Sequence, residues 1–370
     1  MNDHIHLFAT EAEFLSAYTN DYVEPWVSFT MESSGMSFNK EQTPPTHDYS
    51  KDCLTFNITS AGTIVWKMFS QTSGQTISYT KDNGKTWEDI TSTPEGTIIN
   101  VETGDKIMFK GDNPTYGYNY GQNTFSGSTA EFSVEGNIMS LIYGDNFINQ
   151  TTLKSGYTFH GLFDCCTGLT SAENLILPAT TLTENCYMYM FYGCSSLTTA
   201  PEIPATTLAQ NCYQSMFSDC SSLTTAPELP ATTLTEYCYY CMFGGCTGLA
   251  IAPELPATTL AYGCYENMFY DCTSLTSAPE LPATTLVENC YFKMFYGCNS
   301  LNYIKCLATD ISADECTDYW VGSMSSGSGS GSGGGVSPTG TFVKAASMND
   351  WSSKASGAGI PDGWTVQDAS

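Results

Sequence analysis

The nine residues APELPATTL occupy Ala226–Leu234 and recur unchanged at Ala252–Leu260 and Ala278–Leu286. A near copy, APEIPATTL, begins at Ala200, so successive copies are 26 residues apart. A fixed period of this length indicates structural repeats that stack on one another, and it outranks any local signal. The prolines and cysteines that keep the same step are Pro178, Pro204, Pro230, Pro256 and Pro282; Cys186, Cys212, Cys238, Cys264, Cys290 and Cys316; and Cys194, Cys220, Cys246, Cys272 and Cys298.

Each unit combines a segment of helical pattern with a segment of extended pattern. In CYMYMFYGC, the residues Cys186, Met190 and Cys194 follow the i, i+4, i+8 spacing of one helix face. In the following SSLTTAPEIP, Pro201 removes one backbone donor and keeps the predicted strand short. One helix and one strand cannot enclose a core alone, so the units must bury their faces against each other. The sequence predicts a solenoid of 26-residue units over residues 151–320, with parallel short strands and helices.

The chain has sixteen cysteines, and those in the ladders are expected to be structural. The N-terminal sequence MNDHIHLFATEAEF is acidic and lacks the apolar run of a signal peptide, so we expect folding in a reducing cytoplasm, where cysteines stay thiols or bind metals. We favour two ladders of small buried fillers. The alternatives are a zinc site, for which histidine partners are scarce, and strained vertical disulfides. The cysteines outside the ladders, expected to be the most reactive thiols, are Cys165, Cys166 and Cys241.

A second ladder is acidic. It consists of Glu202, Glu228, Glu254 and Glu280. Stacked carboxylates repel one another, so they are either well solvated or neutralised by a cation such as calcium. No loop has the usual calcium-ligand spacing, which favours a solvated edge.

One pair of positions in each unit varies while its neighbours stay fixed. Outward variation on a constant inward framework suits a binding surface, and neutral drift on an exposed face is the alternative explanation. The candidate binding residues are Met188, Tyr189, Gln214, Ser215, Tyr240, Glu266, Asn267, Phe292 and Lys293.

Residues 52–150 have a different character. Short alternating runs such as CLTFNIT, GTIVWKMF and DKIMFKG are separated by Gly, Asn and Asp turns, which predicts a β-sandwich. The sequence TKDNGKTW (Thr80–Trp87) matches one Asp-box, a turn that locks a hairpin. Sialidases contain Asp-boxes, but this chain has a single copy and no arginine for a carboxylate substrate. No nucleophile–base pair or nucleotide-binding fingerprint occurs, so the sequence predicts neither an enzyme nor a cofactor.

The charge excludes two classes of partner. The chain has 38 acidic residues against 12 lysines, for a net charge of −26. This charge repels nucleic acid phosphates and anionic lipid headgroups. No apolar run approaches the ~20 residues of a membrane span, so membrane insertion is not expected either.

The repeats resemble the cysteine-containing leucine-rich repeats called BspA-like, which occur in surface proteins of gut Bacteroidales and in their phages. The resemblance depends on YMFYGCSSLTTA followed by the proline-bearing strand, and it extends to a C-terminal closing module at residues 339–370. A Gly/Ser linker, residues 321–338, precedes that module, which departs from the family pattern.

The N-terminal segment FATEAEFLSAYTNDYVEPWVSFT resembles that of phage fibre and appendage proteins, most specifically at Glu24, Pro25 and Trp26. The resemblance implies that residues 1–51 attach the chain to other virion proteins. His4 and His6 form a weak candidate metal site, to which the copies of a homotrimer would contribute.

Taken together, the sequence predicts a multi-domain α+β protein without catalytic activity. Its expected function is a structural and adhesive component of a phage virion, a tail or head fibre made in the host cytoplasm. Its solenoid would bind a glycan or protein on the host cell surface. The alternatives are a bacterial cell-surface adhesin and a virion decoration protein that binds no receptor.

Overall fold

The computed structural model describes residues 29–32, 35–38, 47–69, 73–118, 121–322, 335–348, 351 and 358–370. The chain forms two compact units, Met1–Asp48 and Tyr49–Ser370. In the first unit, strands β1 (Phe29–Glu32) and β2 (Gly35–Phe38) pair antiparallel. The predicted attachment and metal residues Glu24, Pro25, Trp26, His4 and His6 lie outside the described residues.

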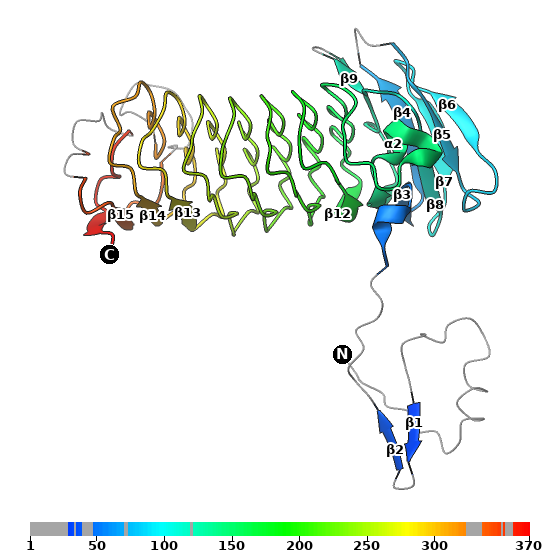
Figure 1. Ribbon diagram of the computed structural model, residues 1–370, viewed down its shortest axis with the longest axis horizontal. Helices are drawn as coiled ribbons and strands as arrows, with labels where there is room; N and C mark the ends of the chain where they lie inside the picture. The colour runs from blue at the N-terminus through cyan, green and yellow to red at the C-terminus, as the bar shows by residue number, and fades with distance from the viewer. Residues whose placement is uncertain are drawn as a thin grey trace. The chain divides into compact units, whose positions relative to one another are not determined.

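The second unit begins with two sheets, in the order β12-β11-β3-β8-β5-β6 and β7-β4-β10-β9 (Figure 1). Phe125 joins them, because its ring contacts Trp66 of β4 at 4.8 Å and Phe109 of β8 at 5.0 Å. The predicted β-structure of this region is therefore confirmed. The strands are β3 (Leu54–Ser60), β4 (Gly62–Met68), β5 (Thr76–Thr80), β6 (Glu88–Thr91), β7 (Thr97–Val101), β8 (Lys106–Lys110), β9 (Gly117–Tyr118), β10 (Gly121–Thr124) and β11 (Glu131–Asn137).

The Asp-box turn closes the β5–β6 hairpin. The Asp82 carboxylate accepts hydrogen bonds from the Thr86 amide (2.9 Å), the Thr86 hydroxyl (2.6 Å) and the Thr80 hydroxyl (2.7 Å). Asn83 (φ 61°) and Gly84 (φ 81°) take the left-handed conformation that this turn requires. The Asp-box here has a structural role, since the polar groups of the turn form hydrogen bonds with one another.

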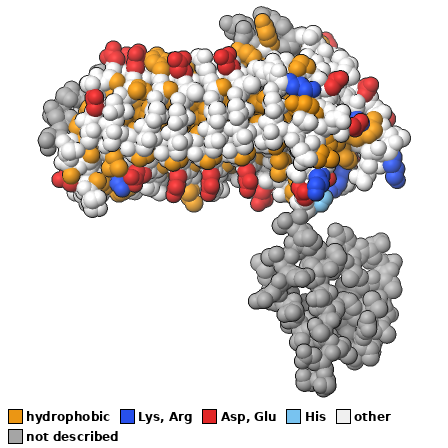
Figure 2. Space-filling model, viewed as in Figure 1, with side chains coloured by type: hydrophobic (Ala, Val, Ile, Leu, Met, Phe, Trp, Pro, Cys, Tyr) orange, Lys and Arg blue, Asp and Glu red, His pale blue; other side chains and the backbone are white. Residues whose placement is uncertain are grey.

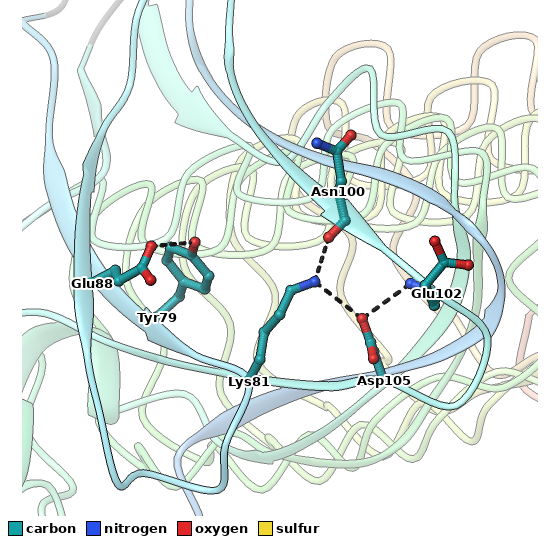
Figure 3. Close-up of polar contacts among 6 residues, drawn as sticks. All are labelled: Tyr79, Lys81, Glu88, Asn100, Glu102 and Asp105. Atoms are coloured by element: carbon teal, nitrogen blue, oxygen red, sulfur yellow. Dashed lines mark hydrogen bonds and ion pairs between the residues drawn. The ribbon is translucent and has the colours of Figure 1, made fainter.

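Polar contacts tie the neighbouring strands together (Figure 3). Tyr79 donates a hydrogen bond to Glu88 across the β5–β6 pair at 2.7 Å. Lys81 donates to Asp105 at 3.1 Å and also to the Asn100 carbonyl, which links the β5 turn to the β7–β8 connection. These contacts lie on an exposed edge and stabilise the connection between strands.

The repeats stack directly on the first sheets. β11 pairs in parallel with β12 (Leu169–Ile176), so the backbone ladder crosses the predicted boundary at residue 150. Beyond it, parallel bridges join equivalent residues of successive units, and Figure 1 shows these coils side by side. Bridges 26 residues apart are Thr181 to Thr207, Thr225 to Ile251 and Thr233 to Thr259.

Two columns of stacked rings fill the centre of the array. The phenylalanines lie 5.3–5.8 Å apart and the tyrosines 5.6–6.0 Å apart from one unit to the next, in the offset stacking that aromatic rings prefer. Both columns end on Trp320, which contacts Tyr291 and Phe295 at 6.3 Å. The columns are Phe163, Phe191, Phe217, Phe243, Phe269 and Phe295; and Tyr187, Tyr213, Tyr239, Tyr265 and Tyr291.

The predicted helices are wrong. The segment of each unit that contains the i, i+4, i+8 pattern is a run of tight turns. Every fourth residue, such as Asn185, Tyr189 and Gly193, has a positive φ, which an α-helix cannot accommodate. Along this segment the amides alternate between two acceptors. One amide donates to the carbonyl three residues earlier, and the next donates to a carbonyl of the following coil, as Tyr189 does to Gln214 at 3.0 Å. Stacking of the coils thus provides hydrogen-bond partners for backbone amides and carbonyls that, in a helix, would bond within the same segment. Within the described residues of the second unit, helical turns occur only at η1 (Tyr49–Lys51), α2 (Ser140–Tyr143) and η2 (Gly144–Asn146).

The C-terminal residues add further coils. Strands β13 (Ser277–Leu281), β14 (Tyr303–Cys306), β15 (Thr341–Lys344) and β16 (Thr365–Asp368) form one parallel sheet. Trp351 stacks on Trp320 at 5.6 Å and closes the aromatic interior. Of the predicted linker, the structure describes residues 321–322 and 335–338. Residues 335–338 precede β15 of this sheet.

The ladder cysteines and methionines are buried, as the repeat interpretation predicts. Met190, Met216 and Met242 are fully enclosed. The second cysteine of each unit also donates its S–H to a phenylalanine carbonyl of the preceding coil, as Cys220 does to Phe191 at 3.1 Å. Cys166 is equally buried, so its assignment outside the ladders is wrong: it begins the second ladder next to Cys194. No disulfide bond joins the cysteines, all of which lie in the described part of the chain.

Candidate functional site

The candidate binding residues lie on one line along the stack. We call this line the variable rib: positions 188–189 and their equivalents at steps of 26 residues. In each pair, the second residue has a positive φ, from Tyr189 (57°) to Lys293 (52°), so every coil turns in the same way at this position. All nine predicted residues lie at this corner. Eight are half-buried, whereas Ser215 is buried with 4% exposure, so it contributes little surface.

The first coils of the rib carry an aromatic group. Tyr189 contacts His160 at 5.8 Å and Tyr192 at 5.6 Å, both with rings at steep angles. Gln214 donates a hydrogen bond to the Tyr189 hydroxyl at 3.4 Å. Burial lowers the pKa of His160 to about 4, so its imidazole is neutral at physiological pH. His160 therefore acts as an aromatic neighbour here and carries no charge.

A second aromatic group surrounds the middle of the rib. Tyr237 contacts Tyr240 at 5.7 Å and Tyr262 at 5.1 Å, with ring planes at 76° and 82°. Asn289 donates a hydrogen bond to the Tyr262 hydroxyl at 2.9 Å. The variation between units identified Tyr240 but not Tyr237, three residues before it, or Tyr262, four residues before Glu266.

Glu266 lies beside this second group. Burial raises the pKa of its carboxyl to about 7; Lys293 opposes the rise and Glu315 adds to it. Asn267 approaches its Oε1 at 3.5 Å. At physiological pH, a half-buried carboxyl of this kind is a mixture of its neutral and charged forms. A nearby cation would favour the charged form.

Lys293 shows how this face binds an ammonium group. Its Nζ lies 5.0 Å from the centre of the Phe292 ring and 5.8 Å from that of Tyr319. Phe292 and Tyr319 are themselves in contact at 5.8 Å. Aromatic faces attract cations at these distances.

The acidic ladder is solvated. Glu202, Glu228, Glu254 and Glu280 are all exposed, and Glu280 pairs with Lys305 at 2.7 Å. Figure 2 shows acidic side chains in rows along both long edges of the array. Among the described residues, no group of three or more potential ligands is arranged to hold a metal ion. The exposure of the ladder agrees with the solvated-edge interpretation.

The thiols that the sequence places outside the ladders differ in exposure: Cys165 is exposed, Cys241 is half-buried and Cys166 is buried. Burial raises the pKa of Cys165 to about 11, with Asp164 adding to the rise, and it also raises the pKa of Cys241. Cys241 and Cys238 have CxxC spacing, but burial raises the pKa of Cys238 to about 12. The thiolate is the reactive form, so a raised pKa lowers the thiolate fraction of all these cysteines. Cys165 and Cys241 are nevertheless more accessible than the buried ladder cysteines, and the expectation that they are the most reactive thiols stays a prediction.

In comparisons with known proteins, no protein-family model, curated protein or solved structure matches the chain. No helix in the described part of the chain is both long and apolar enough to cross a bilayer.

Proposed function

We propose that residues 151–320 form a leucine-rich-repeat solenoid of the BspA-like kind, and that the variable rib is its ligand-binding surface. The observation that carries the proposal is the contrast within each coil. The inward Cys, Tyr, Met and Phe positions are the same from unit to unit and are buried. The rib positions between the conserved Tyr and Met differ in every coil, and all of the nine candidate residues except Ser215 are half-exposed.

The wider role we propose is that of an adhesive, structural component of a phage virion, acting by binding and not by catalysis. The N-terminal resemblance at Glu24, Pro25 and Trp26 supports attachment to other virion proteins. Stacked coils support a rigid display surface, because each coil is fixed by its neighbours. A homotrimeric fibre is the assembly that this role favours.

A binding experiment tests the adhesive role. Fluorescently labelled protein is incubated with a panel of Bacteroidales cells, and bound fluorescence is compared between two triple variants. The rib variant carries Tyr189→Ser, Tyr240→Ser and Phe292→Ser; the control carries Glu202→Gln, Glu228→Gln and Glu254→Gln on the acidic ladder. The proposal expects the rib variant alone to lose most binding. Equal binding by both variants would show that the rib is not the receptor-facing surface.

A mass-spectrometric inventory of purified virions tests the assembly role. Finding the chain in virions but no adhesion to cells would favour a decoration protein. Adhesion without presence in virions would favour a bacterial cell-surface adhesin, the other alternative.

A further inference from the structure

We propose that Tyr237, Tyr240, Tyr262 and Glu266 form a recognition site for the ammonium group of a lysine side chain on a partner protein. The inference rests on the binding role proposed above and names the ligand chemistry of one place on the rib. It is carried by ring geometry, by charge and by a matching contact within the same chain.

Tyr237 lies at the centre of the tyrosine group, in contact with the rings of Tyr240 and Tyr262. Tyr237 meets Tyr240 at 76° and Tyr262 at 82°, so its ring lies steeply against both of its neighbours. Gly263 lies beneath them: an added Cβ would be 2.5 Å from the Tyr237 ring and 3.2 Å from Glu266 Oε2. The ring and the carboxylate therefore converge on one point of the backbone. Aromatic faces attract an ammonium group, and a carboxylate beside them adds an opposite charge.

The charge around the site favours a cation. The groups that face Glu266 are Tyr237 and Tyr240 from the preceding coil, Asn267 from its own, and Lys293 and Glu315 from the coils that follow. No ion pair joins Glu266 to a lysine within the described residues. An incoming ammonium would compensate a half-buried charge that the chain leaves without a close partner.

The neighbouring coil supplies an internal example. One step along the same rib, Lys293 holds its ammonium over the rings of Phe292 and Tyr319. This chain thus already places a lysine on aromatic rings of this face, and the Tyr237 group offers three rings with no lysine over them among the described contacts. A lysine therefore fits the site better than an anionic ligand, which Glu266 would repel.

A titration of the full chain tests the site. The probe is Nα-acetyl-lysine-N-methylamide, followed by NMR, with Nα-acetyl-norleucine-N-methylamide as the uncharged control of equal length. We expect only the lysine probe to bind at the tyrosines. Its affinity should fall at most about tenfold between pH 8 and pH 6, because a pKa near 7 leaves about a tenth of Glu266 ionised at pH 6.

Variants separate the contributions of charge and rings. Glu266→Gln should weaken the probe about tenfold and remove the pH dependence, whereas Glu254→Gln on the exposed ladder should change neither. Tyr240→Leu should weaken binding about threefold, and Tyr240→Phe, which keeps the ring, should not.

Three results would overturn the inference: equal binding of the norleucine probe, unchanged binding by Glu266→Gln, or no binding of the lysine probe. Binding of a neutral N-acetylglucosamine oligomer at these tyrosines in place of lysine would reassign the site to carbohydrate. Loss of cell adhesion in the rib variant would still support the adhesive role in any of these cases, so the two proposals fail separately.

Discussion

At the scale of single residues, the backbone of the array depends on left-handed positions. Gly193 has φ 67°, and a Cβ there would lie 3.1 Å from the Cys165 sulfur. Gly193→Ala should therefore reduce the free energy of unfolding by about 1–2 kcal/mol. Gly335→Ala is the control, because its Cβ would meet nothing within 4 Å. Urea unfolding measures both; equal stability of the two variants would contradict the role of φ.

A second residue-scale prediction concerns acid. The hydrogen bonds from Thr86 and Thr80 hold the pKa of Asp82 well below its usual range. A depressed folded-state pKa adds stability above the unfolded pKa of about 3.9, and that stability is lost as the pH falls below it. Asp82→Asn should lower the urea midpoint at pH 7, and the gap from wild type should narrow at pH 2.5. A gap independent of pH would show that ionisation of Asp82 is unimportant.

At the scale of elements, the aromatic columns should provide much of the stability of the coils. Phe217 is fully buried between Phe191 and Phe243, at 5.4 and 5.8 Å. Phe217→Ala should cost about 3–5 kcal/mol, because it removes a large side chain and leaves a cavity. Ile251→Ala is the matched control: Ile251 is 62% exposed, so the change should stay within about 0.5 kcal/mol. Thermal unfolding followed by circular dichroism distinguishes the two outcomes.

The same elements show what a sequence can reveal. The inward orientation of Cys186, Met190 and Cys194 could be predicted, because it depends only on which residues are buried. Their secondary structure could not. An α-helix advances 100° per residue, so residues eight apart differ by about 80°, which still counts as one face. A turn of four residues gives the same pattern over so short a segment.

The candidate site was predictable only in part, for a related reason. Variation between units marked Tyr240 and Glu266, because these positions break the period. Tyr237 and Tyr262 occupy the same corner of different turns, at positions that hold Asn211 and Glu236 in other units. Their convergence depends on contacts between coils, which a single unit does not encode.

At the scale of the whole molecule, equivalent joints between coils predict that one unit can be removed. Deleting residues 226–251, one period of 26, joins Thr225 to Ala252 and restores every inward position. Phe217 would then stack on Phe269 in the place of Phe243. Because stability in such arrays is close to a sum of units and interfaces, the deleted protein should fold with a lower unfolding free energy. Its tyrosine fluorescence and circular dichroism should be those of a shorter array.

A half-period deletion is the control for that experiment. Removing residues 226–238 shortens the chain by less, yet it sets the proline-bearing segment of one coil against the turns of the next. The phenylalanine column would lose its alignment, and buried amides such as that of Tyr213 would lose the carbonyl of Cys238. Unpaired buried amides are costly, so this protein should aggregate or unfold. If both deletions fold equally well, the register between coils does not determine the structure, and the variable rib has no fixed geometry on which recognition could depend.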